Sequence, residues 1–154
     1  MTETVEQRLA AMGVSVPQAA APAANYVPFM RSGSLLFTAG QLPLKDGKLI
    51  ATGLLGRDLA TAQGQEAARL CAINLIAQAK AALGELDKVA GIVKITVFVA
   101  STSDFTEQHL VANGASDLLA AAFGDKGRHA RSAVGTAALP LNAPVEIEAI
   151  FEVA

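Results

Sequence analysis

The chain has 154 residues and a mass of 15.8 kDa, the size of one domain that can bury a core without disulfides or structural metal. Charged residues make up 17% of the sequence, against roughly 25% in an average soluble domain, which predicts that an oligomer covers part of the surface. A net charge of -2 and a pI near 5.6 disfavour nucleic acid as a partner, and no apolar stretch reaches the roughly 20 residues of a membrane span.

Residues 1–21 are predicted to form a short helix and an extended arm, and residues 22–154 one domain. Val5, Leu9 and Met12 share a helical face, and three prolines follow between residues 16 and 28. The first ten residues lack the basic start and apolar core of a signal peptide, so we expect a cytoplasmic protein without a membrane partner.

A β-hairpin and a long helix are predicted next. The extended segments 34–44 and 48–53 flank Asp46-Gly47, a dipeptide that accepts the positive φ angles of a tight turn. Residues 61–84 then repeat apolar side chains at helical spacing. The single cysteine, Cys71, lies on that apolar face and is predicted to be a buried structural residue, and one cysteine with two histidines disfavours a zinc site.

Residues 91–101 alternate as a strand whose inner face is predicted to carry Val93, Ile95, Val97 and Val99. A second helical region begins after it and ends at Gly124.

Two features mark that second helical region. Ser103 or Asp104 is predicted to cap its first turn. Asn113-Gly114 in its middle predicts a kink or a break, because glycine costs about 1 kcal/mol relative to alanine inside a helix.

Two final strands are predicted over residues 131–139 and 144–153. The two helices can cover only one face of the mixed sheet, yet Phe98, Val134 and Ile150 place apolar groups on the other. We therefore predict a single-domain α+β fold, with both helices on one sheet face and further copies of the chain on the other.

Three segments in this order, "NYVPFMRSGSLLFTAGQLP", "IVKITVFVASTSDF" and "RSAVGTAALPLNAPVEIEAI", resemble the RidA/YjgF family, also called the L-PSP endoribonuclease family. The chain looks most like its longer, YjgF/chorismate-mutase-like branch, whose members often have no defined function. The resemblance implies a chorismate-mutase-like homotrimer with a central barrel of three sheets and a ligand cleft between neighbouring subunits. It also implies hydrolysis of reactive 2-imino acids and enamines to ketoacids and ammonia. No metal or organic cofactor is expected, because an imine is already electrophilic.

The resemblance also assigns site residues. Arg131 matches the family's carboxylate-binding arginine, and Glu146 matches the acid of its "VEIE" segment, so both are predicted to be catalytic. Tyr26, Gly40 and Asn113 match substrate-binding positions.

Two positions depart from the family pattern. Ala39 replaces a serine, and His129 stands where the family usually has proline. His129 is predicted to bind substrate as a proton carrier, with a structural role as the alternative. The loss of the serine hydroxyl, together with the "YVPF" stretch, leaves open a non-catalytic protein that binds small carboxylates or ketoacids.

The chemistry of the assigned residues agrees with an anionic small molecule. A guanidinium makes two parallel hydrogen bonds to one carboxylate, and a glutamate on the following strand is expected close to Arg131, where it can orient water and pass a proton to the leaving amine. An intersubunit salt bridge between Arg131 and Glu146, without catalysis, is the alternative. Ribonuclease activity is disfavoured, because the chain has few aromatic residues and no stripe of basic ones.

Overall fold

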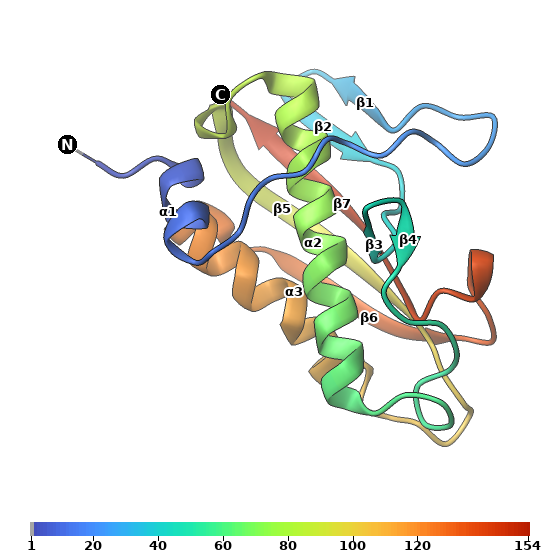
Figure 1. Cartoon of the computed structure of the whole chain (residues 1–154). Coiled ribbons are helices and arrows are strands. Elements are labelled where there is room, and N and C mark those ends of the chain that lie inside the picture. The colour runs from blue at the N-terminus through green and yellow to red at the C-terminus, as the bar shows by residue number, and fades with distance from the viewer. Residues whose placement is uncertain (1) are drawn as a thin grey trace.

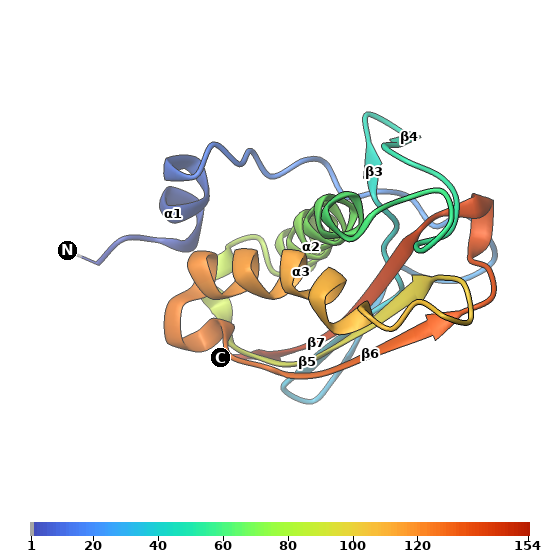
Figure 2. The same cartoon turned by 90° about the horizontal axis from the view of Figure 1, so that it is seen from below.

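The computed structural model describes residues 2–154, so Met1, with which the predicted N-terminal segment begins, lies outside the described residues. A five-stranded mixed sheet carries two long helices on one face (Figures 1 and 2). The elements are α1 (Val5–Ala11), β1 (Phe29–Ser32), β2 (Leu35–Thr38), β3 (Leu44–Lys45), β4 (Lys48–Leu49), α2 (Thr61–Leu83), η1 (Leu86–Lys88), β5 (Val89–Ala100), α3 (Gln108–Phe123), η2 (Gly124–Gly127), β6 (Ala130–Thr136), η3 (Pro140–Asn142) and β7 (Val145–Val153). The single-domain α+β prediction is confirmed.

The sheet has the strand order β1-β2-β7-β5-β6. Its long central strands β5 and β7 are antiparallel, whereas β5 and β6 run parallel across the α3 connection. This order makes β6 an edge strand, and α3 packs beside it (Figure 2).

The core lies between the sheet and α2. Alternate residues of β7, Val145, Ile147 and Phe151, are fully buried there, as predicted for that strand. Alanines on α2 allow its backbone to approach the sheet closely. Cys71 is fully buried among them, and burial raises the pKa of its thiol, which agrees with the predicted structural role.

The helix α3 is continuous, so the predicted kink at Asn113-Gly114 is wrong. Gly114 lies where α3 crosses α2: a Cβ atom at this position would come within 2.7 Å of the carbonyl carbon of Gln65. The glycine therefore serves a close approach of two helix backbones, which local propensity does not reveal.

The start of α3 also differs from the prediction. The helix begins at Gln108, after Glu107, rather than after Ser103 or Asp104. The Thr102 hydroxyl donates a hydrogen bond to the Asp104 carboxylate over 2.7 Å, so this side chain stabilises the preceding turn instead of a helix terminus.

The predicted hairpin at Asp46-Gly47 forms, but its strands are shorter than predicted. Asp46 and Gly47 do adopt positive φ angles of 53° and 78°, but the strands on either side of them, β3 and β4, have two residues each. β2 pairs instead with β1, through a turn that contains Gly33, and with β7. Pro43 has no amide hydrogen to donate, which disfavours extension of β3 toward β2.

The inner face of β5 is shifted at its start. Val93 is 42% exposed, contrary to prediction, and Ile92 is buried in its place. An irregular register against β7 between Ile92 and Lys94 causes the shift, because one extra residue turns the following side chains to the opposite face. Ile95, Val97 and Val99 are buried as predicted.

The second sheet face carries no helix (Figure 2). Apolar side chains are exposed on it, among them Val134 at 44% and Phe37 at 39%, and Phe98 and Ile150 are half-buried. This distribution agrees with the predicted second apolar face. None of the helices described between residues 2 and 154 combines the length and the apolar character that crossing a bilayer requires.

The N-terminal segment packs on the helical side of the domain. Val5 and Leu9 of α1 are buried, and the Arg8 side chain donates a hydrogen bond to the Ala122 carbonyl of α3 over 2.7 Å. The following arm crosses α2 on the side away from the sheet, where Gln78 donates a hydrogen bond to the Ala20 carbonyl (Figures 1 and 2).

Candidate functional site

The Arg131 guanidinium lies between the edge strand β6 and α3. Arg131 pairs with the fully buried Ile95 in the sheet, which directs its side chain to the helical face. Its Nη1 donates hydrogen bonds to Asn113 Oδ1 over 2.9 Å and to Ser116 Oγ over 3.1 Å. Its Nη2 donates to the His109 carbonyl over 3.1 Å. The structure thus brings the predicted Arg131 and Asn113 into direct contact.

His129 belongs to the same cluster. Its Nε2 lies 2.8 Å from Ser116 Oγ, and its Nδ1 lies 2.7 Å from the Gly127 carbonyl oxygen. Sequence reasoning missed Ser116. The signal was present, since Ser116 follows Asn113 by three residues and therefore shares its face of α3.

Glu146 and Gly40 form a second cluster. The loop at Gly40 is held against β7 by reciprocal backbone hydrogen bonds between Gln41 and Ile147, of 2.8 and 3.0 Å. A Cβ atom on Gly40 would lie 2.7 Å from the Glu146 carboxyl carbon, so a side chain at this position would displace the flexible end of Glu146. Glu146 is half-buried, and its pKa is raised, first by that burial and then by the negative charge of Glu148.

The two clusters lie on opposite faces of the sheet within one chain. Glu146 pairs with Phe98 of β5, whereas Arg131 pairs with Ile95, three residues earlier on the same strand. Side chains three apart on a strand point to opposite faces. The expectation that consecutive strands bring Arg131 and Glu146 close together within one chain is therefore wrong.

Tyr26 is separate from both clusters in the single chain. It lies before β1 and is 47% exposed, and its hydroxyl accepts a hydrogen bond from the Ala23 amide over 3.2 Å. Among the hydrogen bonds of residues 2–154, none joins Tyr26 to Arg131 or Glu146.

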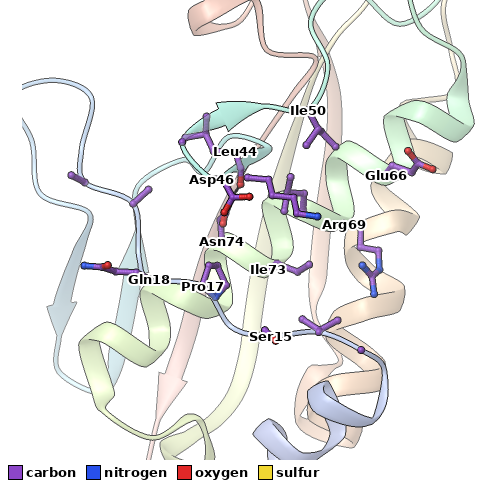
Figure 3. A pocket seen from close by; sticks show the side chains of 17 residues that line it. Ser15, Pro17, Gln18, Leu44, Asp46, Ile50, Glu66, Arg69, Ile73 and Asn74 are labelled. Atoms are coloured by element: carbon purple, nitrogen blue, oxygen red, sulfur yellow. Dashed lines mark hydrogen bonds between the residues drawn. The ribbon is translucent and has the colours of Figure 1, made fainter.

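A groove of about 920 Å³ lies away from all these residues, between the arm, the β3–β4 hairpin and α2. Figure 3 shows Glu66 and Arg69 of α2 along one side and Pro17 of the arm along another. Asn74 donates hydrogen bonds to the Leu42 and Leu44 carbonyls over 2.9 and 3.0 Å, which fix the loop before the hairpin. None of the predicted site residues lines this groove.

Metal-ligating side chains are dispersed over the described chain. Within residues 2–154, no group of three or more His, Cys, Asp or Glu residues is placed to hold an ion.

Comparisons with known proteins place the chain among proteins of one family. Residues 6–152 match the sequence model described as "YjgF/chorismate_mutase-like, putative endoribonuclease". Protein TCP17 of Trypanosoma cruzi is 51% identical over 149 residues, covering 96% of this chain and 93% of TCP17.

Two solved structures extend the likeness to the fold. Atu1372 of Agrobacterium tumefaciens, a protein of unknown function, is 54% identical with a TM-score of 0.92, and the match covers 97% of this chain and 92% of Atu1372. TdcF of E. coli, solved with bound serine, is 28% identical with a TM-score of 0.64, over 89% of this chain and 94% of TdcF. The chain therefore belongs to the YjgF/chorismate-mutase-like family, as its three ordered segments predicted.

Proposed function

We propose that this protein hydrolyses reactive 2-imino acids and their enamine tautomers to ketoacids and ammonia, in clefts between the subunits of a homotrimer. One observation carries the proposal: within the described part of the chain, hydrogen bonds hold the Arg131 guanidinium in place, and two of its N–H groups remain free to bind a ligand. Of its five N–H bonds, three have acceptors within residues 2–154. The N–H of Nε and one N–H of Nη2 remain, and these adjacent nitrogens form the edge that binds a carboxylate side-on.

A cleft that contains both Arg131 and Glu146 requires two protomers, because one protomer directs them to opposite sheet faces. Arg131 lies on the edge strand β6, which a neighbouring subunit can approach. Glu146 lies on the helix-free face, where Val134 and Phe37 leave apolar surface for an interface. The family resemblance supports a trimer in which such faces form a central barrel.

The reaction needs one water and a group that moves protons. Water attacks the imine carbon as the Glu146 carboxylate takes its proton, and the electron pair of the C=N bond moves to nitrogen. Glu146 returns this proton to the nitrogen, which gives an amino alcohol. The hydroxyl proton then passes through Glu146 to the same nitrogen as the C–N bond breaks, so that ammonia leaves and the carbonyl of the ketoacid forms. Burial raises the pKa of Glu146, which makes its carboxylate a stronger proton acceptor than that of an ordinary glutamate.

Two further features support this arrangement. Among the hydrogen bonds of residues 2–154, none uses the Gly40 amide N–H, which can therefore donate to a ligand beside Glu146. TdcF was solved with bound serine, a small molecule that carries a carboxylate.

Decay of 2-aminoacrylate, generated by a serine dehydratase, tests the proposal. The protein is expected to accelerate the decay, and Glu146→Gln is expected to lower turnover by about 100-fold while it still binds pyruvate, because the amide cannot take a proton from water. No acceleration at any protein concentration would refute the proposed reaction.

The second candidate is a carboxylate-binding protein without turnover. Ala39 favours it, because the hydroxyl of the family's serine is missing beside Gly40. Calorimetry that shows pyruvate binding in the wild type and none in Arg131→Ala, without acceleration of 2-aminoacrylate decay, would select this candidate.

A further inference from the structure

A continuous chain of hydrogen bonds links the turn η2 to the Arg131 guanidinium. It runs from the Gly127 carbonyl to His129, from His129 to Ser116, and from Ser116 to Arg131, with successive distances of 2.7, 2.8 and 3.1 Å. The members come from three elements, the turn η2 with the residues after it, the helix α3 and the strand β6.

The direction of each hydrogen bond follows from the chemistry of its ends. The Gly127 carbonyl can only accept, so the proton of the neutral His129 ring resides on Nδ1. Nε2 is then an acceptor, and the Ser116 hydroxyl donates a hydrogen bond to it. The Ser116 oxygen is left with lone pairs, one of which accepts from Arg131 Nη1.

His129 therefore orients the Ser116 hydroxyl so that its oxygen can accept a hydrogen bond from Arg131. Without an acceptor at Nε2, a helical serine turns its hydroxyl proton toward the carbonyl four residues earlier and no longer holds its oxygen toward a neighbour. Asn113 would then be the remaining side chain that holds Nη1. The hydrogen bonds from Nη1 to Asn113 and from Nη2 to the His109 carbonyl would remain, so the guanidinium would keep two of its three restraints and would hold its carboxylate-binding edge less firmly toward the ligand.

We propose that Ser116 and His129 form a positioning pair that fixes the Arg131 guanidinium and presents its Nε and Nη2 edge to a carboxylate. Both ring nitrogens of His129 are engaged within the chain, so His129 acts through Ser116 and does not itself touch the ligand. This assigns a specific role to a residue predicted from sequence to bind substrate directly. The role at the ligand rests on the proposed function, whereas the orientation of Arg131 does not.

Calorimetry with pyruvate and steady-state kinetics with 2-aminoacrylate test the role at the ligand. Ser116→Ala and His129→Leu are expected to weaken pyruvate binding about five- to tenfold and to raise KM with little change in kcat, because each removes one positioning hydrogen bond. Ser116→Thr keeps the hydroxyl, and His129→Gln keeps an acceptor at the place of Nε2, so both should bind pyruvate as the wild type does. Ser103→Ala, an exposed serine outside the cluster, is the matched control.

Nuclear magnetic resonance of the ligand-free protein tests the orientation of Arg131 separately. We expect neutral His129 with its proton on Nδ1, and separate Arg131 Nη resonances that merge in Ser116→Ala and His129→Leu but not in Ser116→Thr or His129→Gln. A proton on Nε2, or unchanged Arg131 resonances in Ser116→Ala, would overturn the positioning pair. A wild type that shows these resonances but neither binds pyruvate nor accelerates 2-aminoacrylate decay would overturn the proposed function alone.

Discussion

Replacement of Arg131 by alanine is expected to lower kcat/KM about 100- to 1000-fold and to abolish measurable pyruvate binding. The substitution removes a charge-assisted bidentate contact to the ligand carboxylate, and loss of such a partly buried partner costs about 3–4 kcal/mol. It also leaves Asn113 Oδ1 and Ser116 Oγ without their guanidinium donor. Steady-state kinetics with 2-aminoacrylate and calorimetry with pyruvate measure both effects.

Two variants sharpen this test. Arg128→Ala removes an exposed arginine from the same segment and is expected to leave pyruvate binding unchanged. Arg131→Lys keeps the positive charge but loses the planar pair of donors, so it should recover little of the binding. Equal pyruvate affinity in Arg131→Ala and in the wild type would remove the basis of the proposed site.

Replacement of Gly114 by alanine is expected to lower the free energy of unfolding by about 3 kcal/mol, although the same change in an ordinary helix raises it by about 1 kcal/mol. The added methyl group would meet the Gln65 backbone, which cannot rotate away as a side chain does, so α2 and α3 must separate. Urea denaturation followed by circular dichroism measures the change.

Ala121→Gly, at an exposed position of the same helix, is the control for helix propensity. It should lower the free energy of unfolding by only about 1 kcal/mol. A Gly114→Ala protein that is more stable than the wild type would show that the two helices do not approach each other as closely as described.

Hydrophobic periodicity predicted the long helix and the long strand correctly. It did not predict features that depend on contacts between residues far apart in the sequence. The helix over 61–83 and the alternating strand over 145–153 follow from their own residues, since each buries one continuous face. The pairing of β2 does not, because a turn signal at Asp46-Gly47 cannot show that a strand beyond Gly33 is the better partner. Local helix propensity likewise predicts a helix break at Gly114. The structure instead shows that glycine is required there because the backbone of α2 lies too close for a side chain.

The candidate site was predicted only in part. The family motifs indicated both Arg131 and Asn113, which the structure joins by a hydrogen bond of 2.9 Å. Ser116 matched no motif, although its spacing from Asn113 puts it on the same helical face. The placement of Arg131 and Glu146 on opposite sheet faces depends on which β5 residue each of them pairs with. This strand register cannot be predicted from the number of residues between them.

Mixed assemblies of two inactive variants test most directly whether each site combines Arg131 of one subunit with the glutamate of its neighbour. Arg131→Ala and Glu146→Gln chains with different tags would be co-expressed, and assemblies carrying both tags isolated. In a trimer, every mixed assembly contains one intact cleft of three, so random assembly should restore about a quarter of wild-type activity before isolation and about a third after it. Mixed assemblies no more active than either variant alone would contradict a site shared between subunits.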